Sequence, residues 1–165
     1  MNPFIVLASG MWLLAGNPTS VLPDPEMTPG AINPDVTPDN IDQTICKPGW
    51  TKIVRPPEEY TEKLKREQIE AYGYTDKRLG AYEEDHLIPL ELGGSPTDPR
   101  NLWPQPIVMA RLKDRLEYDL KRLVCSHVID LHWAQVMIAH DWWSLYKELY
   151  GAQTPDYDVR AEQLK

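Results

Sequence analysis

Apolar residues recur at intervals of three and four positions in two long segments, a spacing that places them on one face of a helix. The first segment predicts an amphipathic helix over about 107–124. Its apolar members are Met109, Leu112, Leu116, Leu120 and Leu123. The second predicts a helix that begins at Asp130, a favourable N-cap, and runs to about Tyr150. Two long helices are therefore expected towards the C-terminal end of the fold.

A shorter and less regular apolar stripe precedes these segments. It predicts a helix that starts near Pro57, whose missing N–H is not needed in the first turn, and ends at Gly73, a natural C-cap. Before it, the β-branched run over 51–55 follows a Pro-Gly turn, which predicts a short strand that stops at Pro56.

Between these helices, two short segments have the length of strands. The first runs from Tyr82 to Leu87, and the second runs from Asn101 to Trp103. Residues 89–100 separate them and carry Gly93-Gly94 and further prolines, which are typical of a loop. The predicted order is strand, loop, strand and helix, within an α+β fold that is mainly helical.

Proline is concentrated near the start of the chain. Nine of the sixteen prolines fall between Pro18 and Pro57, and residues 17–44 have no sustained apolar period, so this segment predicts an extended, mobile, acidic linker. The compact domain is expected over 45–150, a length that can bury one modest core, and a polar tail over 151–165.

The stretch from Phe4 to Gly16 is apolar apart from Ser9. At about a dozen residues it is too short to span a bilayer but fits the apolar region of a secretory signal. Residues 1–16 therefore predict export to the periplasm or the medium. The alternative is an apolar segment that docks on the core or on a partner, in a protein that stays in the cytoplasm.

Cys46 and Cys125 are the two cysteines, and neither belongs to a C-x-x-C pair, which excludes a zinc knuckle built from cysteines. They predict either two reduced, buried thiols or one disulfide from the start of the domain to the end of a helix. The disulfide is the expectation for an exported chain, because disulfides persist in oxidising compartments.

The formal charge of -8 argues at first against a nucleic-acid partner, because phosphates repel surplus carboxylates. The acids, however, lie mainly in the terminal segments. Between Lys47 and Lys147 there are fifteen basic and sixteen acidic residues, so this stretch is nearly neutral. A local basic face on the domain is compatible with this distribution.

An Asp85-His86 pair followed fifteen residues later by Asn101 carries the candidate chemistry. A histidine suits a general base, a carboxylate can hold a divalent cation, and a carboxamide can fix geometry, which together serve phosphodiester hydrolysis. Each residue alone has an ordinary interpretation as well. An Asp-His dipeptide is common, and Asn101 is equally suited to a turn that satisfies its own backbone.

Over Tyr82 to Val124, a quarter of the chain, the order of elements and residues resembles the HNH nucleases of the ββα-metal superfamily. In those enzymes a hairpin and a helix hold one divalent cation. The resemblance implies an HNH-like ββα-metal core in which His86 is the general base and Asp85 is the first metal ligand. Asn101 would orient the base or, as in some branches, bind the metal. The wider pattern is also similar to a group of often exported bacterial proteins with an HNH-type core.

The helix departs from the family pattern. HNH enzymes of the colicin type carry two histidines one turn apart there, and this chain has Ala110 and Asp114 instead. The resemblance then implies a water-rich site held by Asp85 and Asp114, with Glu117 as a further candidate. Carboxylate ligands favour Mg²⁺ or Mn²⁺ over Zn²⁺ or Ni²⁺ as the single divalent metal. Asp114 and Glu117 are also suited to be solvated helix acids that pair with Arg111, Lys113 or Lys121 at helical spacing, and this is the favoured interpretation for Glu117.

The expected activity is metal-dependent endonucleolytic hydrolysis of nucleic acid, DNA rather than RNA, with low sequence specificity. Arg100, Arg111 and Lys113 are the candidate phosphate contacts. Two alternatives stay open. One is a degenerate HNH-type fold that binds nucleic acid without cutting it, and the other is an interaction module whose Trp-rich last helix docks a partner protein.

Overall fold

The computed structural model of the protein describes residues 21–151, so the predicted signal segment over 1–16 and residues 152–165 lie outside the described part. Its helices and strands are α1 (Trp50–Val54), α2 (Glu58–Ala71), β1 (Tyr82–His86), β2 (Leu102–Pro106), α3 (Ile107–Cys125) and α4 (Leu131–Tyr150). Short 3-10 turns occur at Pro38–Gln43, Leu79–Ala81, Leu90–Leu92 and Pro99–Asn101. The expectation of a small α+β domain is confirmed.

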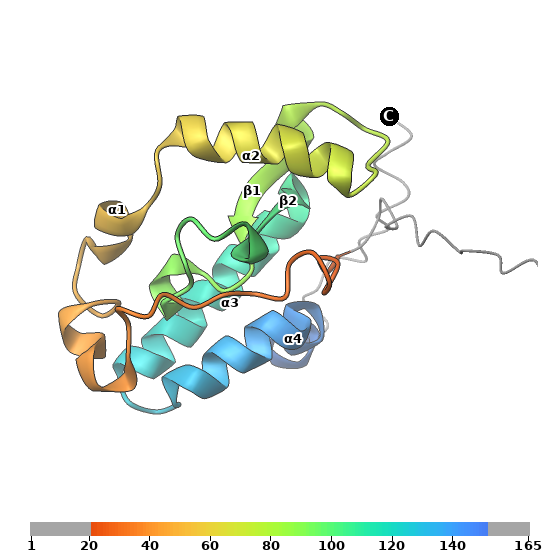
Figure 1. Ribbon diagram of the computed structural model, residues 1–165. Coiled ribbons are helices and arrows are strands. Elements are labelled where there is room, and N and C mark those ends of the chain that lie inside the picture. The colour runs from red at the N-terminus through yellow and green to blue at the C-terminus, as the bar shows by residue number, and fades with distance from the viewer. Residues whose placement is uncertain (1–20, 152–165) are drawn as a thin grey trace, which may run out of the picture.

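The two strands form one antiparallel hairpin, in which Tyr82 pairs with Pro106 and His86 pairs with Leu102. Prolines are tolerated in β2 because each strand has a free edge that needs no backbone donor. Helix α3 follows β2 directly, and the hairpin lies between α2 and α3 (Figure 1). The predicted order of strand, loop, strand and helix is confirmed.

The core lies where α3 packs against α4 and against the hairpin, while α4 also packs against the Leu90–Leu92 turn between the strands (Figure 1). The predicted apolar face of α3 is buried at Leu116 and Leu120, and that of α4 at Ile138 and Trp142. The Asp130 side chain accepts a hydrogen bond from the backbone N–H of Trp133, as expected of an N-cap. Both long helices are therefore confirmed.

The run over 51–55 is helical at Trp50–Val54, so the predicted strand there is wrong. Neither strand of the hairpin pairs with this run. Its backbone instead makes local hydrogen bonds, from Lys52 N to Gly49 O and from Arg55 N to Thr51 O. A β-branched run forms a strand only where another strand can accept its backbone hydrogen bonds.

Residues 21–44 pack on the domain, which corrects the prediction of a separate linker over 17–44. Val36 and Ile41 are buried, and Ile32 forms an isolated antiparallel bridge with Gly94. This segment crosses the face of the molecule in front of the hairpin loop and α3 (Figure 1). Scattered apolar residues and backbone hydrogen bonds hold this segment on the domain. Such contacts leave no periodic pattern in the sequence. The domain thus begins before residue 45.

A disulfide joins Cys46 to Cys125, with Cα atoms 5.5 Å apart and 79 positions between them in sequence. It ties the N-terminal part of the domain to the last residue of α3. The disulfide alternative is therefore the one observed, and it fits an oxidising, exported compartment. Within residues 21–151, the structure has no helix with the length and apolar character that crossing a membrane requires.

Gly94 is packed so tightly that only glycine fits. A Cβ atom on this residue would lie 1.7 Å from the carbonyl oxygen of Ile88 and 2.8 Å from Nδ2 of Asn101. Its N–H donates to the carbonyl of Pro89. The loop between the strands therefore closes on itself at this glycine.

Gly94→Ala should lower the free energy of unfolding by more than about 2 kcal/mol, because the backbone of Ile88 must move to admit the methyl group. Gly80→Ala is the matched control, since no atom lies within 4 Å of a Cβ placed there. Urea denaturation of both variants measures the difference. Equal midpoints would show that the loop adapts to a side chain at residue 94.

Candidate active site

Asp85 and His86 lie at the end of β1, on the wall of a polar pocket of about 340 Å³. Neighbouring residues of a strand normally face opposite sides, but β1 ends at His86, so both can line one pocket. Asp114 of α3 lines it too, which brings together three of the predicted site residues. The pocket is strongly acidic, with six carboxylate residues: Glu83, Glu84, Asp85, Glu91, Asp114 and Glu117.

The His86 ring is held in one orientation and one tautomer. Its Nε2 lies 3.0 Å from the carbonyl oxygen of Pro96, and because a carbonyl only accepts, Nε2 carries the hydrogen. Nδ1 of the neutral ring is then left as a proton acceptor. Burial lowers the pKa of His86 below its usual value, although the Pro96 carbonyl opposes this. His86 as a residue is 7% exposed, and it lines the pocket.

Asn101 is fully buried and satisfies both ends of its carboxamide within the protein. Nδ2 donates to the carbonyls of Ile88 and Ser95, and Oδ1 accepts from the N–H groups of Ile88 and Ala31. These bonds close the loop between the strands, so Asn101 fixes the backbone next to Pro96. Asn101 thus holds the backbone beside the carbonyl that accepts from His86, so it is more than a simple turn residue, but it does not line the acidic pocket itself.

Lys113 differs from the prediction of a phosphate contact, because its side chain is completely buried. Its Nζ donates to Oδ2 of Asp85 at 2.8 Å, to the backbone carbonyl of His86 at 2.7 Å and to Oε1 of Glu117. Burial lowers the pKa of Lys113, but Asp85 and Glu117 outweigh it and raise the pKa above its ordinary value. The ammonium is therefore a permanent charge that joins β1 to α3.

The other predicted phosphate contacts lie away from the pocket. Arg100 is bound to Asp98 at 2.6 Å, and neither Arg100 nor the exposed Arg111 lines the pockets that contain His86. Glu117 pairs with Lys113 at helical spacing, as its structural interpretation predicted. The arginine that does line this pocket is Arg55, at the C-terminal end of α1. No motif in the sequence marks it, because only the packing of α1 brings it near β1.

Several of these carboxyl groups hold their protons more tightly than usual. Burial raises the pKa of Glu84 to about 8, and both of its carboxylate oxygens are buried without a hydrogen-bond partner among the described residues. Burial, with a contribution from Asp85, raises the pKa of Glu83 and of Asp114. Burial also raises the pKa of Glu117, against the effect of Lys113. A cation in this pocket would relieve the repulsion between these groups.

The donor set fits a hard, water-rich cation. Mg²⁺ needs only one or two protein carboxylates and keeps several waters, which Asp85 and Asp114 can provide. Oδ2 of Asp85 is already bound to Lys113, so its other oxygen is the one open to a metal. Within residues 21–151, no three His, Cys, Asp or Glu side chains cluster closely enough to hold a metal entirely by themselves. A closed zinc-type cage is therefore not what these residues form.

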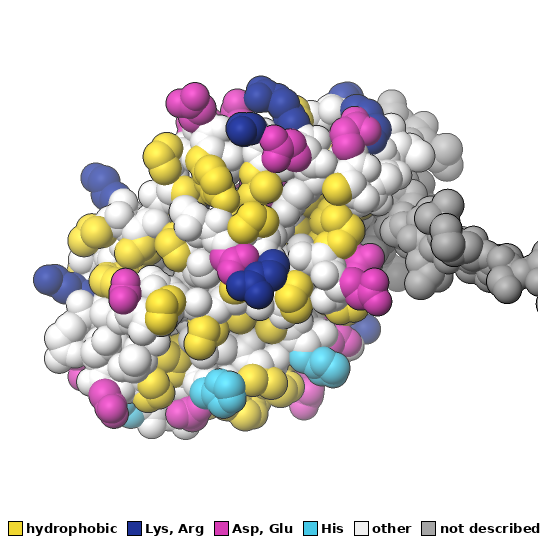
Figure 2. Space-filling view, in the orientation of Figure 1, with side chains coloured by type: hydrophobic (Ala, Val, Ile, Leu, Met, Phe, Trp, Pro, Cys, Tyr) yellow, Lys and Arg dark blue, Asp and Glu magenta, His cyan; other side chains and the backbone are white. Residues whose placement is uncertain are grey.

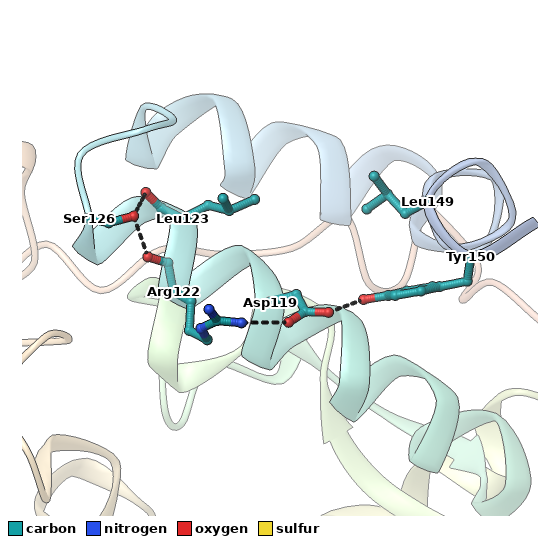
Figure 3. Close-up of a pocket in the computed structure, with 6 residues that line it drawn as sticks. All are labelled: Asp119, Arg122, Leu123, Ser126, Leu149 and Tyr150. Carbon is teal, nitrogen blue, oxygen red and sulfur yellow. Dashed lines mark hydrogen bonds and ion pairs between the residues drawn. The ribbon is translucent and has the colours of Figure 1, made fainter.

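A separate pocket of about 280 Å³ lies between α3 and the end of α4, where Figure 3 shows Leu123 and Leu149 beside polar groups. Tyr150 donates to Asp119 at 2.7 Å, and Asp119 also pairs with Arg122. The pocket contains no histidine or unpartnered carboxylate that could act as a base. Of these two pockets, the one at the end of β1 is therefore the one that contains groups able to act as an acid or a base.

The aromatic residues of α4 divide between the core and the surface. Trp142 is fully buried, whereas Trp133 is 45% exposed.

On the face drawn in Figure 2, acidic and basic side chains are interspersed and form no block of a single sign. That face therefore has no broad basic surface.

Comparison of the chain with protein-family models, curated proteins and solved structures gave no match. The arrangement of the site is thus the basis for assigning a function.

Lys113→Met should lower the free energy of unfolding by about 3–5 kcal/mol, because it leaves Asp85 and Glu117 buried without their shared cation. The matched control is Lys63→Met on α2, where the pair with Glu67 is exposed and should contribute at most about 1 kcal/mol. Chemical denaturation of both variants compares the two losses. Similar values would mean that the buried ammonium is not structurally important.

Glu84→Gln should become more stable relative to the wild type as the pH rises. The folded-state pKa of about 8 lies above the ordinary 4.5, so the contribution of protonated Glu84 is fully present below pH 4.5 and is lost towards pH 8. Across this range the wild type should lose on the order of 5 kcal/mol that the non-titrating variant keeps. Denaturation in EDTA at several pH values tests this. A constant difference would contradict it.

Proposed function

We propose that the protein is a metal-dependent endonuclease that hydrolyses phosphodiester bonds of nucleic acid, with DNA as the expected substrate. The observation that carries this proposal is the state of His86. Burial lowers the pKa of its ring, its Nε2–H is bound to the Pro96 carbonyl, and this leaves Nδ1 as a proton acceptor on a residue that lines the acidic pocket. General-base catalysis of hydrolysis requires such a group.

His86 acts in this proposal by taking a proton from the water that attacks the phosphorus, while the bond from the phosphorus to the 3′ oxygen breaks and that oxygen leaves and takes up a proton from water. The Pro96 carbonyl stabilises the imidazolium that results, because it continues to accept the Nε2–H. Asn101 keeps this carbonyl in place through its bonds to the neighbouring loop backbone. Lys113, through the backbone carbonyl of His86, fixes the end of β1 from the other side.

Asp85 and Asp114 would hold one divalent metal ion, with Mg²⁺ or Mn²⁺ preferred by their oxygen donors. A bound metal supplies positive charge to the phosphate oxygens as negative charge develops in the transition state. The pocket needs this charge, because its own carboxylates repel a phosphodiester. The arrangement of hairpin, closed loop and helix supports the resemblance to HNH nucleases stated from the sequence.

The alternative of a non-cleaving member of the same fold has its own observation. Lys113 already neutralises Asp85 and Glu117, as an internal cation would in a site that had lost its metal. Such a protein would bind nucleic acid and leave it intact across all divalent metals. Catalysis remains the better-supported proposal, because a buried neutral base and unpartnered Glu84 oxygens have no role in simple binding.

Export is also part of the proposal. The disulfide between Cys46 and Cys125 and the apolar stretch over 4–16 both suit a protein that acts outside the cytoplasm. A nuclease of low specificity would there be kept away from the DNA of its own cell.

Cleavage of plasmid DNA should require Mg²⁺ or Mn²⁺, and His86→Ala should reduce it by about 10²–10⁴-fold, the usual contribution of a general base. His132→Ala, which removes an exposed histidine of α4, is the matched control and should cleave normally. In the wild type, activity should persist below pH 6.5 and fall as the pH drops through the lowered pKa of His86.

Three outcomes would contradict the proposal. Intact DNA across Mg²⁺, Mn²⁺, Zn²⁺ and Ni²⁺ would favour the non-cleaving alternative. Cleavage that survives in His86→Ala would remove the assigned base. An acidic limb above pH 6.5 would show that the group that titrates is not a buried histidine of lowered pKa.

A further inference from the structure

A second pocket, of about 500 Å³, adjoins the acidic pocket and extends towards α2. The two pockets share Arg55, Glu83, Glu84 and His86. One is lined on its far side by α3, and the other by residues of α2 such as Thr61 and Lys65. Open space therefore continues on both sides of His86, as a chain that runs past the base would need.

Arg55 is the cation at the junction of the two pockets. It follows the last residue of α1, its N–H donates to the carbonyl of Thr51, and Pro56 and Pro57 restrict the backbone after it. Its side chain is exposed. Its positive charge is close enough to lower the pKa values of Glu83, His86 and Asp114, alongside stronger effects of burial.

Within the described residues, Arg55 has no ion-pair partner within 4.0 Å, although carboxylates surround it. The other cations nearby are placed differently. Lys113 is buried, and Lys65 is half-buried, donates to the backbone carbonyl of Tyr82 and lines the second pocket but not the acidic one. Arg55 is thus the exposed cation that lines both of these pockets.

We infer that Arg55 binds the scissile phosphodiester beside His86, so that a polynucleotide lies across both pockets with its chain continuing on each side. This assignment rests on the proposed function and adds a substrate-binding residue that lies outside the hairpin and α3. A guanidinium can donate two parallel hydrogen bonds to one phosphate, which Lys cannot do. It also offsets the repulsion that the acidic pocket exerts on the substrate.

Binding can be measured without cleavage in the His86→Ala background, with Mg²⁺ and a fluorescently labelled DNA oligonucleotide. Adding Arg55→Gln should weaken binding about tenfold or more, the size of one charge-assisted hydrogen bond. It should also reduce the slope of log K against log salt by about 0.7–0.9, as expected for one lost phosphate contact. Lys52→Gln, an exposed cation on the same helix that lines neither pocket, should change both little.

Cleavage by the single variants provides the second readout. Arg55→Lys keeps the charge and should retain most of the salt slope, but it should cleave more slowly than the wild type because it loses the paired hydrogen bonds. Wild-type binding and cleavage in Arg55→Gln, or an equal loss in Lys52→Gln, would overturn the role of Arg55 and leave the role of His86 intact. A wild-type protein that neither binds nor cleaves DNA would overturn both.

Discussion

The carboxamide of Asn101 is the constraint on which the candidate site depends. It is fully buried, and it joins the start of β2 to both sides of the loop that follows β1 through the backbones of Ile88 and Ser95. Its Oδ1 also accepts from Ala31, which connects the N-terminal segment to the same point. A buried carboxamide with satisfied donors and acceptors is rigid, because any movement would expose an unpaired polar group. The Pro96 carbonyl is therefore held in place, and it in turn holds the orientation of the His86 ring.

A second buried polar group fixes the other side of the site. The Lys113 ammonium distributes its hydrogen bonds between β1 and α3, and no solvent reaches it. Such a group costs desolvation energy and is retained where it specifies a unique arrangement. Here it sets the direction in which Asp85 points and holds the backbone of His86 against the helix. The consequence for chemistry is that one oxygen of Asp85 is committed to structure and the other is left for a ligand.

The acidic groups of the site would repel an anionic substrate unless positive charges offset them. Six carboxylate residues line the pocket beside His86, and burial raises the pKa of several of them. An anionic substrate could approach only if cations compensate. This is the physical reason for proposing a metal ion here and for the proposed role of Arg55, which has no ion-pair partner among residues 21–151. Residues 47–147 are nearly neutral in total, and this total charge did not indicate an acidic pocket, because a sum along the sequence does not say which acidic side chains lie together in space.

The sequence by itself determined the local elements and the pair at the end of β1. Helical spacing predicted α3 and α4 because apolar residues recur along one face, but it did not predict the break in the helical backbone of α4 at Asp141. The glycine pair predicted the loop that Gly94 makes possible. Only the tertiary structure decided the rest. Residues 21–44 pack on the domain through scattered contacts that leave no periodic pattern in the sequence. The 51–55 run is helical because no strand lies beside it to accept its backbone hydrogen bonds. The roles of Lys113 and Arg55 were decided by distant neighbours, because the burial of a charged side chain depends on what packs over it, and spacing along the chain does not carry that information.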